Sequence, residues 1–465
     1  MLTYELKKSS GVPLYEALYR CIRGDILSGA LRPGEKLPSK RALAENLEVS
    51  KITVEAAYSQ LLSEGYICSK EKVGYFVETV ERRAPVPAAP ALRPKEDAAC
   101  LLDLTANGTE QFPFSVWSRL QREVMLDFGE ALLAPLPNRG IPELRQAIAG
   151  HLAAFRGMRV DPENILIGAG TDFLYNLLIQ LLGREKIYAV EEPGYGKIRK
   201  IYAAGGVKTV SAAMDDRGVI PESLGSADVL HISPSHHFPT GIVTPVSRRR
   251  ELLDWANRGE KWIIEDDYDS EFRYQSRPIP SLQSIDGQGR VIYMGTFSRS
   301  VAPALRISYM VLPETLLRRY HETYRGFSST VSGFEQAVLG QFMLEGHFET
   351  HVNRMRIYYR SRRQCLVDAL EPLSPWMEIL GQPAGHHLTL RLSNGMNEEA
   401  LVSSAKALGV RVYPISPYFL DGVPEAHQST VLLGFGGLTD EEIRLGAGLL
   451  IRAWAPNAKG ANHES

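Results

Sequence analysis

Short, largely apolar runs alternate with helical patterns over most of the chain. The runs have the character of strands that are buried on both faces, and they span residues 165–167, 187–190, 207–211, 229–232, 262–264, 291–294 and 307–311. The intervening segments repeat apolar residues at helical spacing. This alternation predicts an α/β domain with an open, mostly parallel sheet that is covered by helices on both faces.

Beyond about residue 345 the pattern changes to a helix, short strands near 388–392 and 431–435, and a final helix. This change predicts a smaller C-terminal α+β subdomain.

The first 80 residues have a different pattern, which predicts three helices followed by two short strands. Residues 12–29 form an amphipathic pattern, Ser39 can cap a helix over 40–47, and Ser50 can cap a second helix over 51–64. Two short helices joined by a three-residue turn are typical of a helix-turn-helix. Segments 67–68 and 75–77, joined by a turn that contains Lys72, can form a β-wing. The apolar residues of the second helix are interpreted as core residues: Ile52, Val54, Ala57, Tyr58, Leu61 and Leu62.

A Pro/Ala-rich segment over 81–100 separates the two parts. Its prolines remove backbone donors and favour extended conformations, which predicts a linker. The expected organisation is a head over 1–80, the linker 81–100, a large domain over 101–456 and a disordered tail over 457–465.

Composition narrows the class of protein. The 465 residues carry 52 Lys and Arg and 54 Asp and Glu, a formal charge of −2, so contact with nucleic acid requires a local basic face. No apolar run approaches the roughly 18 residues of a membrane span, and no membrane contact is expected.

The four cysteines form no CxxC pair, which argues against a zinc ribbon and a disulfide-stapled fold. We expect no metal site and a cytoplasmic location.

Three polar segments follow predicted strands. Residues 168–171, Gly-Ala-Gly-Thr, stand at the step from a strand into a helix, where exposed N–H groups favour an anion. In EDDYD, acids and Tyr268 come just past a buried strand, where open α/β sheets bind ligands. Thr296, Ser298 and Arg306 supply two hydroxyls and a guanidinium that suit a phosphate monoester. Each segment alone also fits a tight turn or ordinary surface groups, and their order is the stronger argument.

The segment PSKRALAENLEVSKITVEAAYSQLLSEGYI resembles the GntR-type winged helix. The resemblance implies that the head binds a double-stranded DNA operator through Ser39, Lys40, Arg41, Ser50, Lys51, Thr53 and Lys72. Any one of these lysines could equally be an ordinary solvated charge.

Residues 101–456 resemble a fold-type-I aminotransferase that depends on pyridoxal 5'-phosphate (PLP). EEPGY, SPSHHFPTG, EDDYDSEF, MGTFS and ALRISYMVLP occur in the expected order, so nearly the whole chain resembles the MocR/GabR transcriptional regulators. The resemblance implies that Asp266 partners the pyridine nitrogen, Tyr268 binds the ring hydroxyl and Tyr195 flanks the ring. It assigns the phosphate to Gly170, Thr171, Thr296, Ser298 and Arg306. It also implies a head-to-tail homodimer.

Two departures from that family affect its chemistry. The residue after TFS in the family is the Schiff-base lysine, and here it is Arg299. A guanidinium stays protonated, so Arg299 offers no free amine for an internal aldimine and cannot shuttle the catalytic proton. PLP binding is therefore expected to be non-covalent, unless the bulk of Arg299 excludes the ring. In the C-terminal segment, the position aligned with the substrate-carboxylate arginine is Gly437, although Lys197 or Arg199 could supply a cation.

Three hypotheses remain open on the sequence. The preferred one is a DNA-binding regulator whose aminotransferase-like domain senses PLP or an amino compound, with ordinary turnover absent or very slow. The second is a PLP-dependent aminotransferase with a fused DNA-binding head. The third is a PLP-free repressor that uses the large domain as a dimerisation scaffold.

Overall fold

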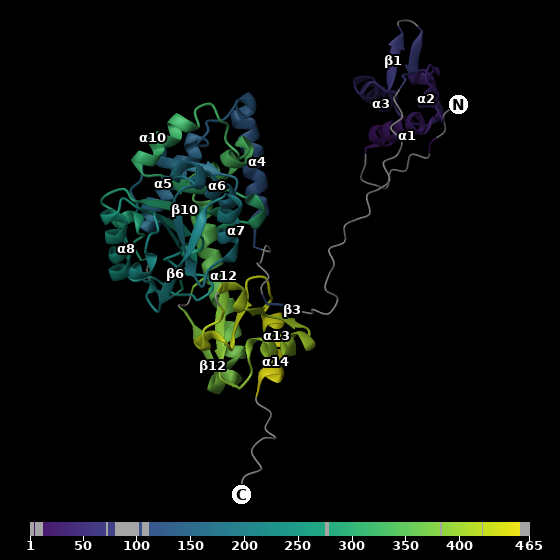
Figure 1. Ribbon diagram of the computed structural model, residues 1–465. Helices are drawn as coiled ribbons and strands as arrows, with labels where there is room; N and C mark the ends of the chain where they lie inside the picture. The colour runs from purple at the N-terminus through teal and green to yellow at the C-terminus, as the bar shows by residue number, and fades with distance from the viewer. Residues whose placement is uncertain are drawn as a thin grey trace. The chain divides into compact units, whose positions relative to one another are not determined.

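The computed structural model describes residues 4, 13–70, 73–79, 102–104, 111–274, 279–381, 384–420 and 422–455. The chain forms two compact units, Met1–Glu96 and Asp97–Ser465, and each is described by itself. Figure 1 shows the helices and strands of both units. Lys72, the predicted linker 81–100 and the predicted tail 457–465 lie outside the described residues.

The first unit is a winged helix. It contains α1 (Leu14–Ser28), α2 (Lys40–Asn46), α3 (Lys51–Ser63), β1 (Ile67–Lys70) and β2 (Gly74–Val77). The side chains of Ser39 and Ser50 accept hydrogen bonds from the third residue after each, so both predicted helix caps are confirmed. β1 and β2 pair antiparallel, with Ile67 opposite Val77, and form the wing.

An eight-stranded sheet organises the second unit. Its strand order is β4-β11-β10-β9-β8-β5-β6-β7. The strands are β4 (Ile165–Gly168), β5 (Ile187–Glu192), β6 (Lys208–Asp215), β7 (Gly218–Val219), β8 (Val229–Ile232), β9 (Trp262–Asp267), β10 (Val291–Thr296) and β11 (Ser308–Val311). β10, β9, β8, β5 and β6 are successively parallel, whereas β11 is antiparallel to both of its neighbours. The predicted strands and the mostly parallel sheet are confirmed.

Helices cover both faces of this sheet. They are α4 (Phe114–Phe128), α5 (Pro142–Arg156), α6 (Thr171–Leu182), α7 (Gly196–Ala204), α8 (Val246–Arg258), α9 (Phe297–Ser300), α10 (Glu314–Thr323), α11 (Gly333–Leu344) and α12 (His347–Ala369). Successive residues of β9 point to opposite faces of the sheet. Ile263 packs in a cluster with α8, and Ile264 packs in a cluster with α6, α7 and α10. The alternation follows from the two-residue period of a strand.

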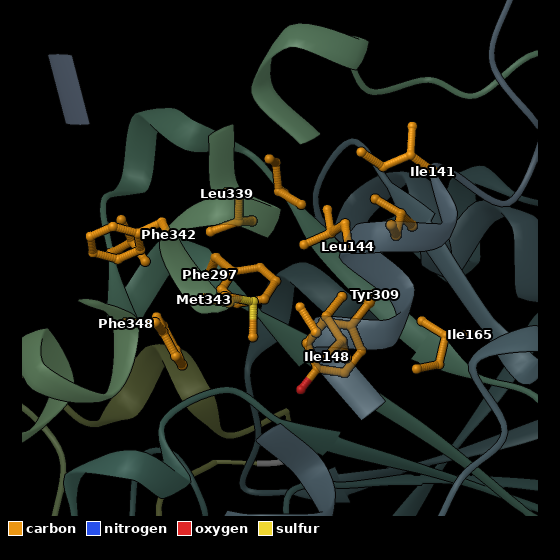
Figure 2. Close-up of a cluster of buried hydrophobic side chains, with 14 of the residues drawn as sticks. Ile141, Leu144, Ile148, Ile165, Phe297, Tyr309, Leu339, Phe342, Met343 and Phe348 are labelled. Carbon is orange, nitrogen blue, oxygen red and sulfur yellow. The ribbon is translucent and has the colours of Figure 1, made fainter. Parts of the chain in front are cut away.

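Figure 2 shows part of the core cluster in which residues of α5 and α11 pack against β4 and β11, and α4 contributes further residues to the same cluster. Phe297, the first residue of α9, is buried in that cluster and contacts Phe348 with ring centroids 5.6 Å apart. This anchor fixes the turn after β10, from which Ser298 and Arg299 project.

A smaller α+β subdomain completes the second unit, as predicted. Its sheet has the order β12-β13-β16-β15, with β12 (Met377–Leu380), β13 (His387–Leu392), β15 (Tyr413–Pro414) and β16 (Thr430–Gly434). Helices α13 (Glu398–Ala407) and α14 (Asp440–Trp454) cover it, and β14 (Val410–Arg411) pairs with β3 (Leu102–Asp103). Within the described ranges, no helix combines the length and the apolar character that crossing a membrane demands.

Candidate functional site

A cavity of about 500 Å³ lies at the carboxyl edge of the large sheet. Its walls come from segments at the ends of β5, β8, β9 and β10 and from the small subdomain. The predicted cofactor-binding residues that line it are Thr171, Tyr195, Asp266, Tyr268, Thr296, Ser298, Arg299 and Arg306. Parallel strands bring their carboxyl ends to one edge, and for this reason segments far apart in sequence meet here.

Asp266 presents its carboxylate to this cavity. One oxygen accepts a hydrogen bond from the hydroxyl of Tyr175, and burial, reinforced by the charge of Asp266, raises the pKa of Tyr175 well above its usual value. The other oxygen, Oδ1, is buried and has no hydrogen-bond partner among the described residues. A buried carboxylate oxygen without a donor suits a ligand that carries an N–H group.

Asp267, the next residue, has a structural role. Its side chain is fully buried, 3.0 Å from the guanidinium of Arg156, and it accepts a hydrogen bond from Tyr293 at 2.6 Å. Because successive side chains of a strand point to opposite faces, only one of these neighbouring acids can face the cavity.

Tyr268 lies beside Asp266 on the cavity wall. Its hydroxyl donates to the backbone oxygen of His236 at 2.9 Å, and burial raises its pKa well above the usual value. Tyr195 stands at a more open position, 49% exposed, with its ring 6.0 Å from that of Phe238 in an edge-to-face arrangement.

Hydroxyl and guanidinium groups gather at another part of the wall. Gly170 has φ +85°, and a Cβ atom there would lie 2.6 Å from a terminal nitrogen of Arg306, so glycine permits the guanidinium to approach the turn. The hydroxyl of Ser298 is buried and has no partner among the described residues. Thr296 accepts hydrogen bonds from the backbone of Ser298 and from the hydroxyl of Ser308. This cradle offers donors to an anion at the start of α6.

Arg299 also lines the cavity, from the first turn after β10. Its charge acts on Tyr268 and on two imidazoles of the small subdomain, His386 and His387. Burial, with a contribution from Arg299, lowers the pKa of His386 to about 3, and burial lowers that of His387 well below its usual value. Both imidazoles are therefore neutral at pH 7, and Arg299 supplies a permanent positive charge to this part of the cavity.

Sequence reasoning missed Glu191 as a member of the site. It lines the cavity at the end of β5, accepts a hydrogen bond from the backbone N–H of Ser233 at 3.0 Å, and is 7% exposed. Burial raises its pKa to about 8. The available signal was an acid directly after the apolar run 187–190, at the end of a strand where open α/β sheets bind ligands.

The small subdomain contributes an aromatic and apolar wall that was also missed. The ring of Tyr418 lies 4.9 Å from that of Phe238, which belongs to the loop after β8, and residues 432–434 of β16 line the same space. Gly437, the position aligned with the substrate-carboxylate arginine, is not among the residues that line the cavity, whereas residues 432–434 of the same segment line it.

Lys197 and Arg199, the two cations considered in place of the missing arginine, are both paired with acids, and Ser235 in the loop after β8 is also bonded. Lys197 lines the cavity but pairs with Asp172 at 2.7 Å, and Arg199 pairs with Glu192 at 2.8 Å. Ser235 accepts a hydrogen bond from Arg156.

Apart from Lys72, which lies outside the described residues, the predicted DNA-binding residues lie on α2 and α3 and at their caps. Arg41 is highly exposed and pairs with Glu45, and Lys51 is exposed in the first turn of α3. Lys40 is more enclosed, with its ammonium 2.6 Å from Glu55 and 5.4 Å from the ring centre of Tyr75. Lys40 thus joins α2 to α3 and to the wing.

The hydroxyls of the two caps are used within the fold. Ser39 accepts from the backbone N–H of Ala42, and Ser50 accepts from the backbone N–H of Thr53, each at 3.1 Å. The hydroxyls of Ser50 and Thr53 lie 2.8 Å apart.

The interpretation of Ile52 as a core residue is wrong. Its side chain is 77% exposed, whereas Val54, Ala57, Tyr58 and Leu61 are buried. Helical periodicity explains the difference, because position 52 lies on the face of α3 opposite the one that packs on α1 and α2.

Comparisons with known proteins agree with both parts of the fold. Residues 14–77 match the family of bacterial regulatory proteins called the gntR family. The chain is 38% identical to the HTH-type transcriptional regulator YhdI of Bacillus subtilis, with 98% of each chain covered. It is 33% identical to the "Probable rhizopine catabolism regulatory protein MocR" of Rhizobium meliloti, with 97% of this chain and 95% of that protein covered.

The second unit has structural neighbours among aminotransferases. An archaeal alanine:glyoxylate aminotransferase superposes with a TM-score of 0.68 over 76% of this chain and 90% of its own, at 24% identity. This likeness shows a fold-type-I aminotransferase-like fold. The chain therefore belongs to the MocR-type helix-turn-helix transcriptional regulators, which bind DNA through a GntR head and carry an aminotransferase-like domain.

Proposed function

We propose that this regulator senses PLP, or an amino compound that reaches PLP, in the cavity of its aminotransferase-like domain. The observation that carries the proposal is the unpartnered Oδ1 of Asp266 in the same cavity as Tyr268 and the cradle around Arg306. These groups match the pyridine nitrogen, the ring hydroxyl and the phosphate of PLP. A relative that is 31% identical, of Corynebacterium glutamicum, is named as a pyridoxine biosynthesis transcriptional regulator.

Each part of the cavity has a distinct task in this proposal. Asp266 holds the ring nitrogen in its protonated form, and Tyr268 bonds the ring hydroxyl while Tyr195 flanks the ring. Thr171, Ser298 and Arg306 hold the phosphate, with Gly170 and Thr296 shaping the turn around them. When bound, PLP supplies an electrophilic aldehyde toward amines.

Arg299 is compatible with ligand binding in this site but not with the covalent catalysis of an aminotransferase. It contributes a permanent positive charge beside the ring, but it has no free amine for a covalent bond and moves no proton at the substrate carbon. We therefore propose non-covalent PLP binding without ordinary turnover. A ligand matters for regulation only through its different affinities for two states of the protein.

Equilibrium dialysis of PLP against the full-length protein tests this function. We expect PLP to be retained and to change the affinity for a selected DNA duplex about 5- to 100-fold. After borohydride treatment, which reduces the unbound aldehyde to an alcohol, denaturation should release all of the cofactor as pyridoxine 5'-phosphate. No retention of PLP with intact DNA binding would favour the scaffold alternative. Borohydride-fixed PLP with steady release of a keto acid would favour the aminotransferase alternative.

We further propose that the large domain forms a homodimer through an apolar face on α4, the turn after it, and α11. This face carries exposed large side chains: Phe114, Met125, Leu126, Leu133, Phe334 and Leu344. Leu126 is 75% exposed and Leu133 is 76% exposed. Apolar surface of this kind is typical of a protein interface.

The double substitution Leu126→Asp with Leu133→Asp should convert the dimer to a monomer. Two buried carboxylates at the interface would be desolvated without partners. Sedimentation velocity measures the change. Leu445→Asp, at an exposed apolar residue of α14, is the matched control and should leave the dimer intact. A dimer that persists in the double variant would place the interface elsewhere.

A further inference from the structure

Ile52 is an exposed apolar side chain on a helix whose other large apolar residues are packed. It is 77% exposed, while Val54, Tyr58 and Leu61 of the same helix are each fully buried. It lies in the first turn of α3, one residue after Lys51. Packing within the winged helix therefore does not explain why an isoleucine stands there.

The position of Ile52 points to DNA. α3 is the second helix of the helix-turn-helix, and in this motif the N-terminal residues of the second helix contact base edges in the major groove. Several polar groups near Ile52 are engaged with one another, since the hydroxyls of Ser50 and Thr53 are 2.8 Å apart and Glu55 is bound to Lys40, while Lys51 is exposed. Ile52 is therefore an exposed apolar side chain surrounded by polar side chains at the start of α3.

The chemistry of the major groove selects the partner. Thymine is the base that presents an apolar group there, its C5-methyl, and apolar side chains read it by contact. We infer that Ile52 contacts the methyl group of a thymine in the operator and thereby determines specificity at that base pair. Lys51 beside it contributes affinity through phosphate, which carries no sequence information. This inference uses the DNA-binding role of the family and does not depend on the ligand of the large domain.

Removal of single methyl groups from the DNA tests the inference. The probe is a duplex selected from a random-sequence pool by the full-length protein, in which each thymine is replaced in turn by deoxyuridine. For the wild type, we expect at least one replacement to weaken binding about fourfold, which corresponds to one buried methyl group. For Ile52→Ala, the same replacement should have no effect.

Two control variants separate this role from others. Leu27→Ala removes a different exposed apolar side chain of the head, 43% exposed on α1, and should keep the wild-type response to deoxyuridine. Lys51→Ala should weaken binding to all duplexes alike, reduce the salt slope by about 1, and also keep that response. Thermal unfolding of each variant checks that the head is folded.

Two results would overturn the inference. One is a wild-type protein that binds every deoxyuridine duplex as tightly as the parent duplex. The other is an Ile52→Ala variant that responds to deoxyuridine as the wild type does.

Discussion

Arg299→Lys should give the full-length protein a covalent bond to PLP that the wild type does not form. The new amine would lie at the end of β10, in the cavity that contains Asp266 and Tyr268, and it can condense with the aldehyde of PLP. We expect a visible absorption band after PLP is added, and a mass increase of one phosphopyridoxyl group after borohydride reduction. The wild type should show neither fixed mass nor fixed absorbance.

The covalent bond should depend on the position of the lysine. Arg306→Lys places the same amine among the phosphate-binding groups, and borohydride should not attach PLP covalently to this variant. Arg299→Met removes the charge without adding an amine and shows how much Arg299 contributes to non-covalent affinity. If Arg299→Lys gains no borohydride-fixed PLP while it folds normally, the proposed placement of the ring is wrong.

Asp267→Asn should destabilise the large domain by about 3–5 kcal/mol, which is the usual cost of breaking a buried ion pair. The substitution removes the charge that faces Arg156 at 3.0 Å, where both side chains are almost inaccessible to water. Burial acts to lower the pKa of Arg156, but Asp267 together with the other acidic groups nearby outweighs it and the pKa is raised, so the variant would leave a buried cation without its ion-pair partner. Urea unfolding of the PLP-free protein measures the loss.

Asp266→Asn is the matched variant at the neighbouring acid and should have the opposite profile. Asparagine keeps an oxygen that can accept the hydrogen bond from Tyr175, and the unpartnered Oδ1 contributes no hydrogen bond to the PLP-free fold, so stability should change little. Affinity for PLP should fall about 10- to 100-fold, since a charged hydrogen bond to the pyridine nitrogen is lost. Equal effects of both variants on stability and on PLP affinity would contradict the separate roles of the two acids.

The position of the cavity between the large-sheet region and the small subdomain fits the proposed sensing function. The cavity has walls from the large-sheet region and from the small subdomain, so a ligand bound there would contact both. A site with Arg299 can be occupied without consuming its ligand, which suits a sensor better than turnover does.

Much of the fold follows from local patterns in the sequence. The strands of the large sheet stand out as apolar runs, and the caps at Ser39 and Ser50 mark the starts of α2 and α3. The antiparallel direction of β11 does not follow from such patterns, because an apolar run carries no information on strand direction.

Some features of the candidate site also follow from the sequence, and others follow only from the tertiary structure. The sequence by itself determined a GntR head, an aminotransferase-like domain, and the chemical groups at the ends of β9 and β10, because these depend on residue type and order along short segments. The tertiary structure alone decided that Lys40 is bound to Glu55, that Ile52 is exposed, and that Glu191 and residues 432–434 line the cavity. These features depend on which distant segments cover each side chain, and periodicity within one element does not specify its partner.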